Sequence, residues 1–544
     1  LDGVTGVQTC ALPICPEIFA GRKEFIRRTV ERYEAYGANY PVSSILLLGT
    51  GWDNWTQTED LSLFIRKYNA ESDGTIRLVD ARYEDFFAAA EKEIREQNLT
   101  IPVMEGTFGI CWEEWAAHLA GLTAQFRQAE RLLRLAEAGE TLRTVAGHGE
   151  AKNRDLIRHG FVELLRFAEH DFGGTDRRRA ALSAGTRADA VTEAADIARS
   201  LQPEPVERTV PLKDGRPEET TFSWRGGRVV FDPNRCCVAS VADAAGRPWV
   251  GADRSPGFGE FVHARYRGQA KPDSVFPEVL PSSAATMLRG LRCSRTDLGV
   301  RIAADFDRSG FQVGSEWLFH EANPWIDVSY YLPDGWTDDP QTVEFRFPFA
   351  VDKPAYWYDT PGAIVAAGPK QAGGDDLPGA NPELYASVTF AAASDRRRTA
   401  LVLAPDSLLW RFGREDACMT SMPMMNLTRN DHQFGQGGQR QWTFRYRIVL
   451  LDKPFDPLVA VQEAQRFDVP PFLHVRGQSP VVPGLEALDI DFPGGPLLAF
   501  KIAQDNRRVI LRFWNVLDRE TDGSFRNRRR SEEHTSELQS HHPI

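Results

Sequence analysis

The feature that most constrains the fold is a change in sequence pattern near residue 205. Before it, apolar residues recur at helical spacing, with short apolar runs of β type between them. After it, the sequence alternates between apolar and polar residues and is rich in aromatic residues, Pro and Gly. Helical spacing indicates helices with one buried face, and alternation indicates half-buried strands. We therefore expect a multidomain protein with α/β, all-α and all-β regions.

Residues 16–110 have the pattern of βα units, because apolar runs alternate with helical segments. Strands that are apolar throughout are typical of parallel sheets covered on both faces. We interpret this region as the C-terminal part of an α/β barrel. The predicted order is helix Ile18–Tyr36, strand Ser44–Leu48, helix Glu59–Ala70, strand Thr75–Val79 and helix Arg82–Gln97.

Residues 111–204 are predicted to be almost wholly helical. Three helices with short joins, at Leu119–Ala138, Asp155–Ala168 and Ala188–Leu201, indicate a three-helix bundle. Residues 205–515 contain strand-like runs such as GVRIAADF, IDVSYYL and QWTFRYRIVLL, separated by turn signals such as Lys213-Asp214-Gly215. This length predicts a large antiparallel β-sandwich region.

The two ends are excluded from the fold prediction. Val4–Ile14 (VTGVQTCALPI) and Arg530–His541 (RSEEHTSELQSH) resemble in-frame translations of short-read sequencing adapters. We expect residues 1–15 to be an artefact of this kind and residues 516–544 to be a disordered or adapter-like tail. On this expectation the natural chain is longer than the printed one, and a signal peptide cannot be read from it.

Composition narrows the classes of partner. Hydrophobic residues make up 42% and charged residues 26%, as in globular proteins. No run of about eighteen apolar residues is present, so we expect no membrane partner. The net charge of −12 argues against a nucleic-acid partner. The seven cysteines form no CxxC pair, and we expect the adjacent Cys236 and Cys237 to lie in one strand and point to opposite faces.

The first candidate site follows the predicted strand Ser44–Leu48. Trp52, Asp53, Asn54 and Trp55 occupy the loop after it, where parallel sheets carry functional side chains. Tryptophan faces stack on sugar rings, and a partly desolvated carboxyl has the raised pKa that a general acid requires. The alternative interpretation is an Asp-Asn turn with tryptophans packed on the sheet edge.

A second loop, Val103–Gly109, carries Glu105 and is followed by Trp112. Glu105 is a candidate ligand for a sugar hydroxyl, and its alternative role is to cap the next helix or face solvent. The third candidate is the helix end Glu169-His170-Asp171 before Gly173-Gly174. Neutral imidazole binds zinc, and a neighbouring carboxylate binds metal or substrate or orients the ring. The alternative for His170 is a favourable interaction with the helix dipole.

These segments together resemble glycoside hydrolase family 38, over most of residues 16–515. The family's strand-end Gly-Asp-Asp-Phe is similar to Gly49–Trp52, and its Arg…Ala-Glu helix is similar to Gln125–Glu137. Its His-Asp-…-Gly-Thr zinc segment resembles His170-Asp171 followed by Gly174-Thr175. The strings PGFGEF, FRFPFAV, GGDDLPG and LAPDSLLW are similar to those of bacterial members.

The resemblance implies an α-mannosidase-like enzyme, a zinc-dependent retaining glycoside hydrolase with two catalytic carboxyl groups. It makes His170 the last zinc ligand and Asp171 a group that contacts substrate or metal. Thr50-Gly51 stand where the family has Asp-Asp, so Asp53, the nearest acid, is the candidate acid/base. Trp52, Asn54, Trp55, Glu105, Trp112 and Asp171 are the candidate substrate-binding residues.

The family's His-x-Asp zinc pair and nucleophilic aspartate have no counterpart here, since no histidine precedes His118. We therefore expect the remaining zinc ligands upstream of this sequence and expect the chain alone to be inactive. The expected partner is an α-mannoside or oligosaccharide, and family members tend to form homo-oligomers. Bacterial members are often cytoplasmic, which favours that location if the source is bacterial. The alternative function is a non-catalytic carbohydrate-binding β-sandwich protein.

Overall fold

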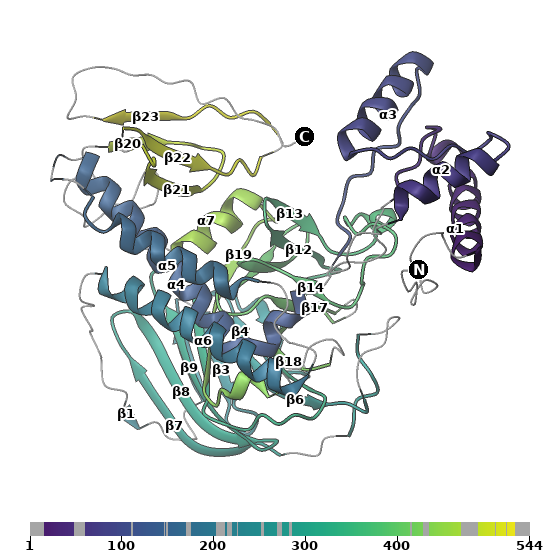
Figure 1. Ribbon diagram of the computed structural model, residues 1–544. Helices are drawn as coiled ribbons and strands as arrows, with labels where there is room; N and C mark the ends of the chain where they lie inside the picture. The colour runs from purple at the N-terminus through teal and green to yellow at the C-terminus, as the bar shows by residue number, and fades with distance from the viewer. Residues whose placement is uncertain are drawn as a thin grey trace. The chain divides into compact units, whose positions relative to one another are not determined.

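The computed structural model (Figure 1) divides into two compact units, Leu1–Glu105 and Gly106–Ile544, which are described separately. The residues that it describes are 16–47, 60–109, 113–145, 147, 149, 151–169, 176–202, 213–214, 220–225, 227–251, 255–268, 275–281, 285–413, 416–427, 435–468, 488–505, 507–517 and 519–527.

The first unit consists of helices in its described residues. Apolar residues of α1 and α2 form its core, in which the rings of Phe19 and Phe64 meet edge to face with centroids 5.4 Å apart. Arg22 and Asp60 form an ion pair at 3.0 Å beside this core. All three predicted helices of this region are confirmed. The elements are α1 (Pro16–Glu34), the 3₁₀ helix η1 (Gly37–Asn39), α2 (Leu61–Glu71) and α3 (Tyr83–Gln97).

The strand predicted at Thr75–Val79 is wrong, and Ser44–Leu47 are not in a strand either. The backbone of Leu78 pairs instead with the side-chain amide of Asn69, which accepts a hydrogen bond from its N–H at 2.9 Å and donates one to its carbonyl at 2.8 Å. A strand requires a neighbouring strand to satisfy its backbone groups. Here one asparagine on α2 satisfies both groups of Leu78.

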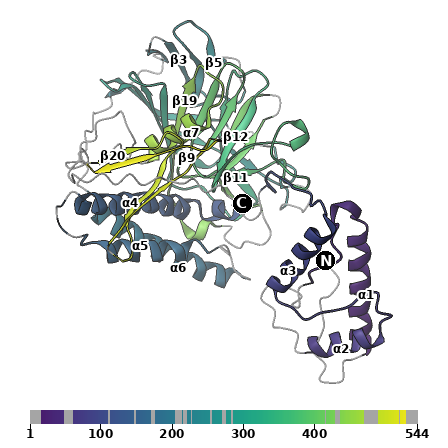
Figure 2. The ribbon, with the colours of Figure 1, turned by 90° about the horizontal axis from the view of Figure 1, so that it is seen from above.

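The second unit begins with helices that cover the β-sheets. Figure 2 shows α4, α5 and α6 side by side in one layer, with the sheets on one side of it. The rings of Phe126 and Phe167 stack between α4 and α5, with centroids 4.9 Å apart. Gly160 allows α5 to approach α4 closely, since a Cβ there would lie 2.9 Å from Leu133. The helices are η2 (Glu113–Leu119), α4 (Ala120–Val145), α5 (Arg154–Phe167), α6 (Arg177–Ser200), η3 (Lys370–Ala372), η4 (Gln436–Gly438) and α7 (Pro457–Asp468).

The largest sheet has ten strands, all paired antiparallel. Its order is β1 (Lys213–Asp214), β7 (Met287–Arg295), β8 (Gly299–Arg308), β9 (Phe311–His320), β10 (Trp325–Leu332), β19 (Trp442–Leu451), β16 (Thr399–Leu403), β15 (Phe390–Ser394), β12 (Ala355–Thr360) and β13 (Ala363–Ala366).

Smaller antiparallel sheets complete the β region. The five-stranded sheet has the order β14 (Tyr385–Ala386), β17 (Leu409–Phe412), β18 (Cys418–Met425), β11 (Gln341–Pro348) and β6 (Glu260–Arg265). The four-stranded sheet runs β2 (Thr221–Trp224), β3 (Gly227–Asp232), β4 (Cys237–Ala242) and β5 (Pro248–Val250). Two ribbons pair β20 (Leu488–Asp491) with β23 (Ser524–Asn527) and β21 (Leu497–Ile502) with β22 (Val509–Phe513).

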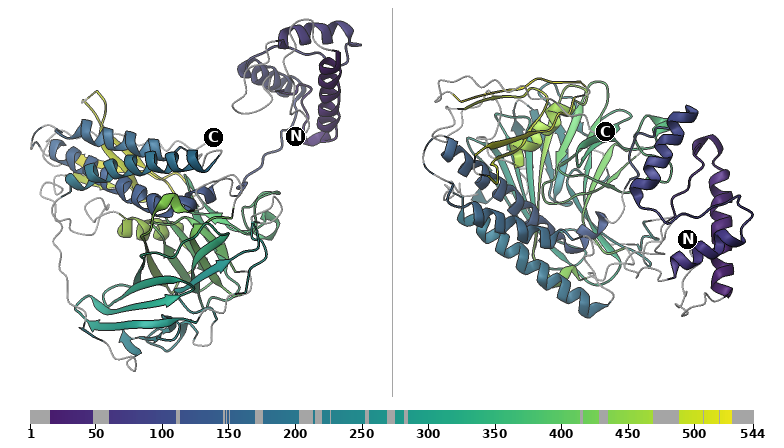
Figure 3. Two further views of the ribbon diagram at one scale, coloured as in Figure 1. Left: turned by 60° about the horizontal axis from the view of Figure 1, so that its bottom comes forward. Right: turned by 45° about the horizontal axis from the view of Figure 1, so that its top comes forward.

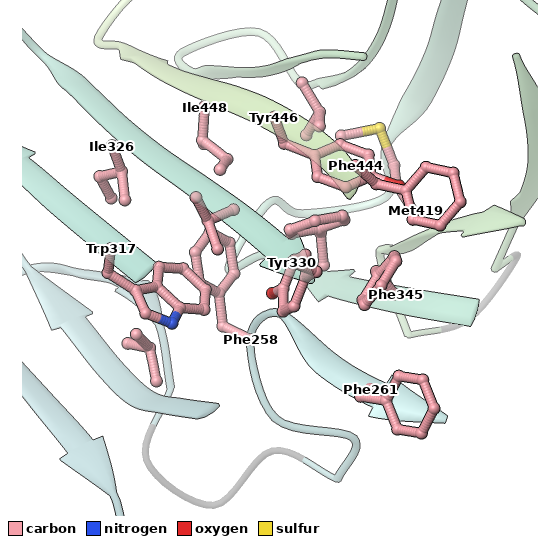
Figure 4. Close-up of a cluster of buried hydrophobic side chains, with 14 of the residues drawn as sticks. Phe258, Phe261, Trp317, Ile326, Tyr330, Phe345, Met419, Phe444, Tyr446 and Ile448 are labelled. Atoms are coloured by element: carbon pink, nitrogen blue, oxygen red, sulfur yellow. The ribbon is translucent and has the colours of Figure 1, made fainter. Parts of the chain in front are cut away.

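The main core is aromatic and lies between the ten-stranded and five-stranded sheets (Figure 4). Tyr330 of β10 stacks on Phe345 of β11 with ring centroids 3.9 Å apart, and its hydroxyl donates to the carbonyl of Gly259 at 2.7 Å. Gly259 has φ +70°, and a Cβ there would lie 2.2 Å from Trp317. A side chain at this position is therefore excluded both by the backbone and by the core.

Glu260, next to Gly259, is a buried carboxylate with several donors. Arg308 donates to it at 2.8 Å, the amide of Gly257 donates at 2.8 Å, and Arg235 forms a third hydrogen bond. Burial raises the pKa of Glu260, but these hydrogen bonds and the arginine charges lower it by a larger amount, so the net pKa is below its ordinary value. The ion cluster joins β6 to the end of β8.

Arginines of α4 attach the helical layer to the sheets. Arg127 donates to the carbonyl of Pro405 at 2.6 Å and also to that of Val388. Arg131, which is buried, donates to the same Pro405 carbonyl at 3.1 Å and lies 3.5 Å from Asp406. Figure 3 shows the same helical layer against the sheets from two further sides. These contacts make α4 part of the β unit.

A mixed protein of helices and antiparallel sheets was predicted, and this is confirmed. Among the described residues no helix is both long and apolar enough to cross a membrane. The placement of Cys236 was wrong: it lies before β4 with φ +51°, and only Cys237 is in the strand. Both side chains are buried, because the turn folds Cys236 back onto the core.

Candidate functional site

Most predicted site residues lie outside the described part of the chain, so the structure places Glu105 alone among them. Glu105 is exposed and is the last residue of the first unit. The residues outside the described ranges are Trp52, Asp53, Asn54, Trp55, Trp112, His170 and Asp171. The described segments that adjoin them are the loop after Glu105, the end of α5 and the start of α6.

The loop directly after Glu105 is docked on a turn of the β region. The Thr107 N–H donates to the Asp375 carbonyl at 2.8 Å, and the Leu377 N–H donates to the Thr107 carbonyl at 2.8 Å. Thr107 and Asp376 thereby form a parallel bridge. This bridge fixes the backbone at Thr107, two residues after Glu105 in the sequence.

The close approach of the two backbones requires glycine. Gly106 has φ +146°, and a Cβ on it would lie 2.4 Å from the Asp375 carbonyl oxygen. Gly109 has φ +77°, and its Cβ would lie 3.0 Å from the Asn381 nitrogen. Glycine alone populates such angles freely. The spacing of Gly106 and Gly109 is therefore the local reason that this loop docks here.

We call residues 366–377, the turn that the loop contacts, the docking turn. Asp376 is the polar residue at its centre. Its Oδ2 accepts hydrogen bonds from the Gly368 amide at 2.9 Å and from the Tyr385 hydroxyl at 3.1 Å. Its Oδ1 is buried and has no hydrogen-bond partner within the described part of the chain. Tyr358, also buried, lies beside it and hydrogen-bonds the side chain of Thr107.

Burial raises the pKa of Asp376, and the neighbouring charge of Asp375 raises it further. Burial also raises the pKa of Tyr358, with the Asp376 charge as the second cause. A carboxyl of this kind holds a proton more readily than an ordinary aspartate does. Since Asp376 is only 7% exposed, the cluster acts on the loop that it holds and is closed to a sugar-sized ligand.

The described residues just before His170 (Phe167 and Glu169) are held by Arg187 of α6. The Arg187 guanidinium donates to the Phe167 carbonyl at the end of α5, and it pairs with Glu169 at 3.1 Å. Arg187 itself is 5% exposed. The residue before His170 is thus tied to a buried cation of the neighbouring helix.

The described chain resumes at Asp176, at the start of α6. Asp176 caps this helix, since its carboxylate accepts hydrogen bonds from the amides of Arg178 at 2.9 Å and Arg179 at 3.0 Å. One imidazole and one carboxylate are fewer than the roughly four ligands that zinc takes, so His170 and Asp171 alone do not complete a zinc site.

Sequence reasoning missed the residues that hold the Glu105 loop. The predicted loop contains Gly106 and Gly109, and the string GGDDLPG contains Asp375 and Asp376. The sequence does not predict that these two segments pair with each other. The two glycines were the available signal in the sequence, because glycine is favoured where two backbones approach each other closely. Their partner, more than 250 residues away, is not readable from local pattern.

The chain resembles known proteins in its structure and not in its sequence. No protein-family model matches the sequence, and no curated protein matches it. Among solved structures, one similar chain is a protein in glycosyl hydrolase family 38 from Enterococcus faecalis, at TM-score 0.61 and 12% identity, covering 95% of this chain and 76% of that one. Another is an alpha-mannosidase from Enterococcus faecalis V583, at TM-score 0.64 and 12% identity, covering 93% and 74%.

Identity of 12% leaves the fold as the shared property, and both matches extend over both units and nearly the whole chain. The structural neighbours of this chain are glycoside hydrolase family 38 proteins, and the chain has their fold.

Proposed function

We propose that the protein to which this chain belongs is a zinc-dependent retaining glycoside hydrolase that cleaves α-mannosides. The observation that carries the proposal is the likeness in fold to family 38 over 95% of the chain. The neighbour that is an alpha-mannosidase supports the choice of sugar. The order of site-like segments along the sequence supports the reaction class.

In this proposal Asp53 is the general acid and then the general base. A retaining glycosidase needs one carboxyl to protonate the leaving oxygen and a second, about 5–5.5 Å away, to attack the anomeric carbon. Trp52 and Trp55 flank Asp53 in sequence and would exclude water from it, which raises the pKa of a carboxyl. The nucleophile would be a second carboxyl group, a role that is assigned to none of the candidate residues.

Sugar binding is assigned to aromatic and polar residues around these carboxyl groups. Trp52, Trp55 and Trp112 would stack on pyranose rings, and Asn54, Glu105 and Asp171 would bind hydroxyls. The docked loop supports the role of Glu105, because Thr107, two residues later, is fixed by two backbone hydrogen bonds to the docking turn. A carboxylate next to a fixed backbone loses little entropy on binding a ligand.

His170 is assigned as one ligand of a zinc site that requires further ligands. When bound, zinc would grip sugar hydroxyls and help to orient and distort the ring. Arg187 and Asp176 support this role, because they fix the residues on either side of the His170 segment. The 544 residues alone are proposed to bind zinc weakly at His170 and to be catalytically incomplete.

The test is to sequence the source locus through both ends of this reading frame and to express the longer protein. We expect it to hydrolyse aryl α-mannosides, to release the product first as the α-anomer in ¹H NMR, and to lose activity to a chelator. The 544-residue chain is expected to show no turnover in the same assay.

Variants assign the acid/base. Asp53→Asn is expected to lower kcat/KM by about 10²–10⁴-fold, the usual contribution of a general acid–base group. Asp80→Asn is the matched control, because Asp80 is an exposed aspartate of the same unit. A longer protein that binds mannosides but has no turnover, in the wild type as in both variants, would make it a carbohydrate-binding protein instead.

A further inference from the structure

Three side chains with metal-ligating atoms meet between α5 and α6. His159 and Glu163 lie one turn apart on α5, so they share a face of that helix, and Glu193 faces them from α6. The His159 Nε2 lies 2.7 Å from Glu193 Oε1, and His159 Nδ1 lies 4.0 Å from Glu163 Oε1. One ligand atom from each residue falls within 4.8 Å of the others. We call these residues the α5–α6 triad.

Glu163 is the part of the triad that is unusual for a surface ion pair. Its side chain is 2% exposed, whereas those of His159 and Glu193 are 48% and 52% exposed. Arg166 pairs with its Oε2 at 3.0 Å, but its Oε1 is buried and accepts no hydrogen bond from the residues that the structure describes. A buried carboxylate oxygen without a donor is costly, and an additional cation would remove that cost.

We propose that the α5–α6 triad binds a divalent transition-metal ion of the zinc type, at a site separate from His170. The set of one imidazole and two carboxylates is typical of Zn²⁺ and Co²⁺, whereas Ca²⁺ and Mg²⁺ take oxygen ligands. Three protein ligands leave a fourth position for water. The site needs none of the residues assigned to sugar cleavage.

The geometry lies within reach of such a site. Two ligand atoms that are each about 2.0–2.2 Å from one Zn²⁺ lie roughly 3–3.6 Å from each other in tetrahedral coordination. One imidazole nitrogen binds the ion, and one ligand atom of each residue already lies within 4.8 Å of the others, so a small contraction of the triad brings the three atoms to this separation. The two exposed side chains supply this movement, since Glu163 is held by burial and by Arg166.

Binding would cross-link two helices next to the predicted site. α5 ends at Phe167 and α6 begins at Arg177, so both helices border the segment that contains His170. An ion held from both helices would reinforce the Arg187 link at the same interface. The ion would thus have a structural role, because binding to the folded state raises its stability.

The experiment uses the 544-residue chain carrying His170→Ala, so that metal at His170 does not contribute. Co²⁺ is the probe, since its visible absorption reports nitrogen and oxygen ligands at low coordination number, and Zn²⁺ is then added in competition. His159→Ala and Glu193→Gln remove exposed ligands, and Asp196→Asn on α6 is the matched control. Asp196 pairs with Arg199 at 2.8 Å and lies outside the triad.

We expect one Co²⁺ per chain, displaced by Zn²⁺, with a thermal unfolding midpoint that rises with metal. Asp196→Asn should keep this behaviour, while His159→Ala and Glu193→Gln should each weaken Co²⁺ binding by tenfold or more. Glu163→Gln, read by the Co²⁺ spectrum, should do the same wherever that variant folds. Equal Co²⁺ affinity in the wild type and in both His159→Ala and Glu193→Gln would overturn the proposal, as would the absence of any saturable Co²⁺ spectrum.

Discussion

Substitution of Gly106 by alanine tests whether the loop after Glu105 is held by the docking turn. Gly106 has φ +146°, and a Cβ there would lie 2.4 Å from the Asp375 carbonyl oxygen. The obstructing atom belongs to the backbone, so a side-chain rotation cannot relieve the clash. The variant must either keep a strained backbone or separate the loop from the turn.

The magnitude follows from these two alternatives. A non-glycine residue in a sparsely populated backbone region costs on the order of 1–3 kcal/mol. Separation loses the hydrogen bonds from Thr107 to Asp375 and from Leu377 to Thr107, each with a net value of about 1 kcal/mol. Either route weakens the docked state by about 2 kcal/mol, which corresponds to a roughly 30-fold larger open population.

Hydrogen exchange followed by mass spectrometry measures this population directly. The amides of Thr107 and Leu377 are both donors across the contact and exchange only when it opens. Gly379→Ala is the matched control, because Gly379 has φ +94° but no atom within 4 Å of the added Cβ. Its left-handed backbone alone costs about 1 kcal/mol, or roughly fivefold in exchange, and only for its own turn.

The reasoning is refuted if Gly106→Ala leaves exchange at Thr107 and Leu377 at the wild-type rate. It is also refuted if Gly379→Ala accelerates these two amides as much as Gly106→Ala does. The first result would mean that the backbones do not approach closely. The second would mean that the turn is weak everywhere and that the glycine contact has no special role.

Two further predictions concern Gly259 in the aromatic core and its neighbour Glu260. Gly259→Ala should lower the free energy of unfolding by about 3 kcal/mol or more, because the added Cβ would lie 2.2 Å from Trp317. The control is Gly268→Ala, since Gly268 has φ +88° but open space around the added Cβ. Equal thermal unfolding midpoints for the two variants would contradict the prediction. The lowered pKa of Glu260 means that its stabilisation is complete above the unfolded value of about 4.3 and is lost as the pH falls through the folded pKa. Glu260→Gln should therefore reduce stability at neutral pH and show a weaker loss of stability under acid, measured by denaturant titration at several pH values; parallel pH profiles for the two proteins would argue against it.

Much of the fold was predictable because pattern and burial agree in it. The run IDVSYYL places Ile326, Val328, Tyr330 and Leu332 on one face, and all four are buried. The helices of both units follow from their apolar spacing. β18 was not predicted, because all eight of its residues are buried and its sequence, CMTSMPMM, has neither alternation nor many β-branched residues. A strand buried on both faces gives no period-two signal.

The first unit shows the opposite case, in which a convincing local pattern failed. Thr75–Val79 reads as a strand, but a strand depends on a neighbour that the sequence pattern cannot supply. Asn69 takes that place for Leu78 by pairing with its N–H and carbonyl. The candidate site was predictable only as separate segments, since the contact between Thr107 and Asp376 joins residues remote in sequence. Local patterns identify what a segment can do, and long-range contacts decide what it meets.

The same distinction explains how a fold persists at 12% identity. Several hydrogen bonds between distant segments of this protein run from a side chain to main-chain atoms. Arg127 donates to the carbonyls of Pro405 and Val388. Gln436 accepts from the amide of Ala120 and donates to the carbonyl of Ala117. A main-chain carbonyl is present whatever side chain its residue carries, so the partner position is free to vary. Only the residue that reaches across, and the glycines that admit a close approach, must keep their chemistry. A few such positions, together with the apolar pattern of the strands, are enough to specify the architecture while most side chains change.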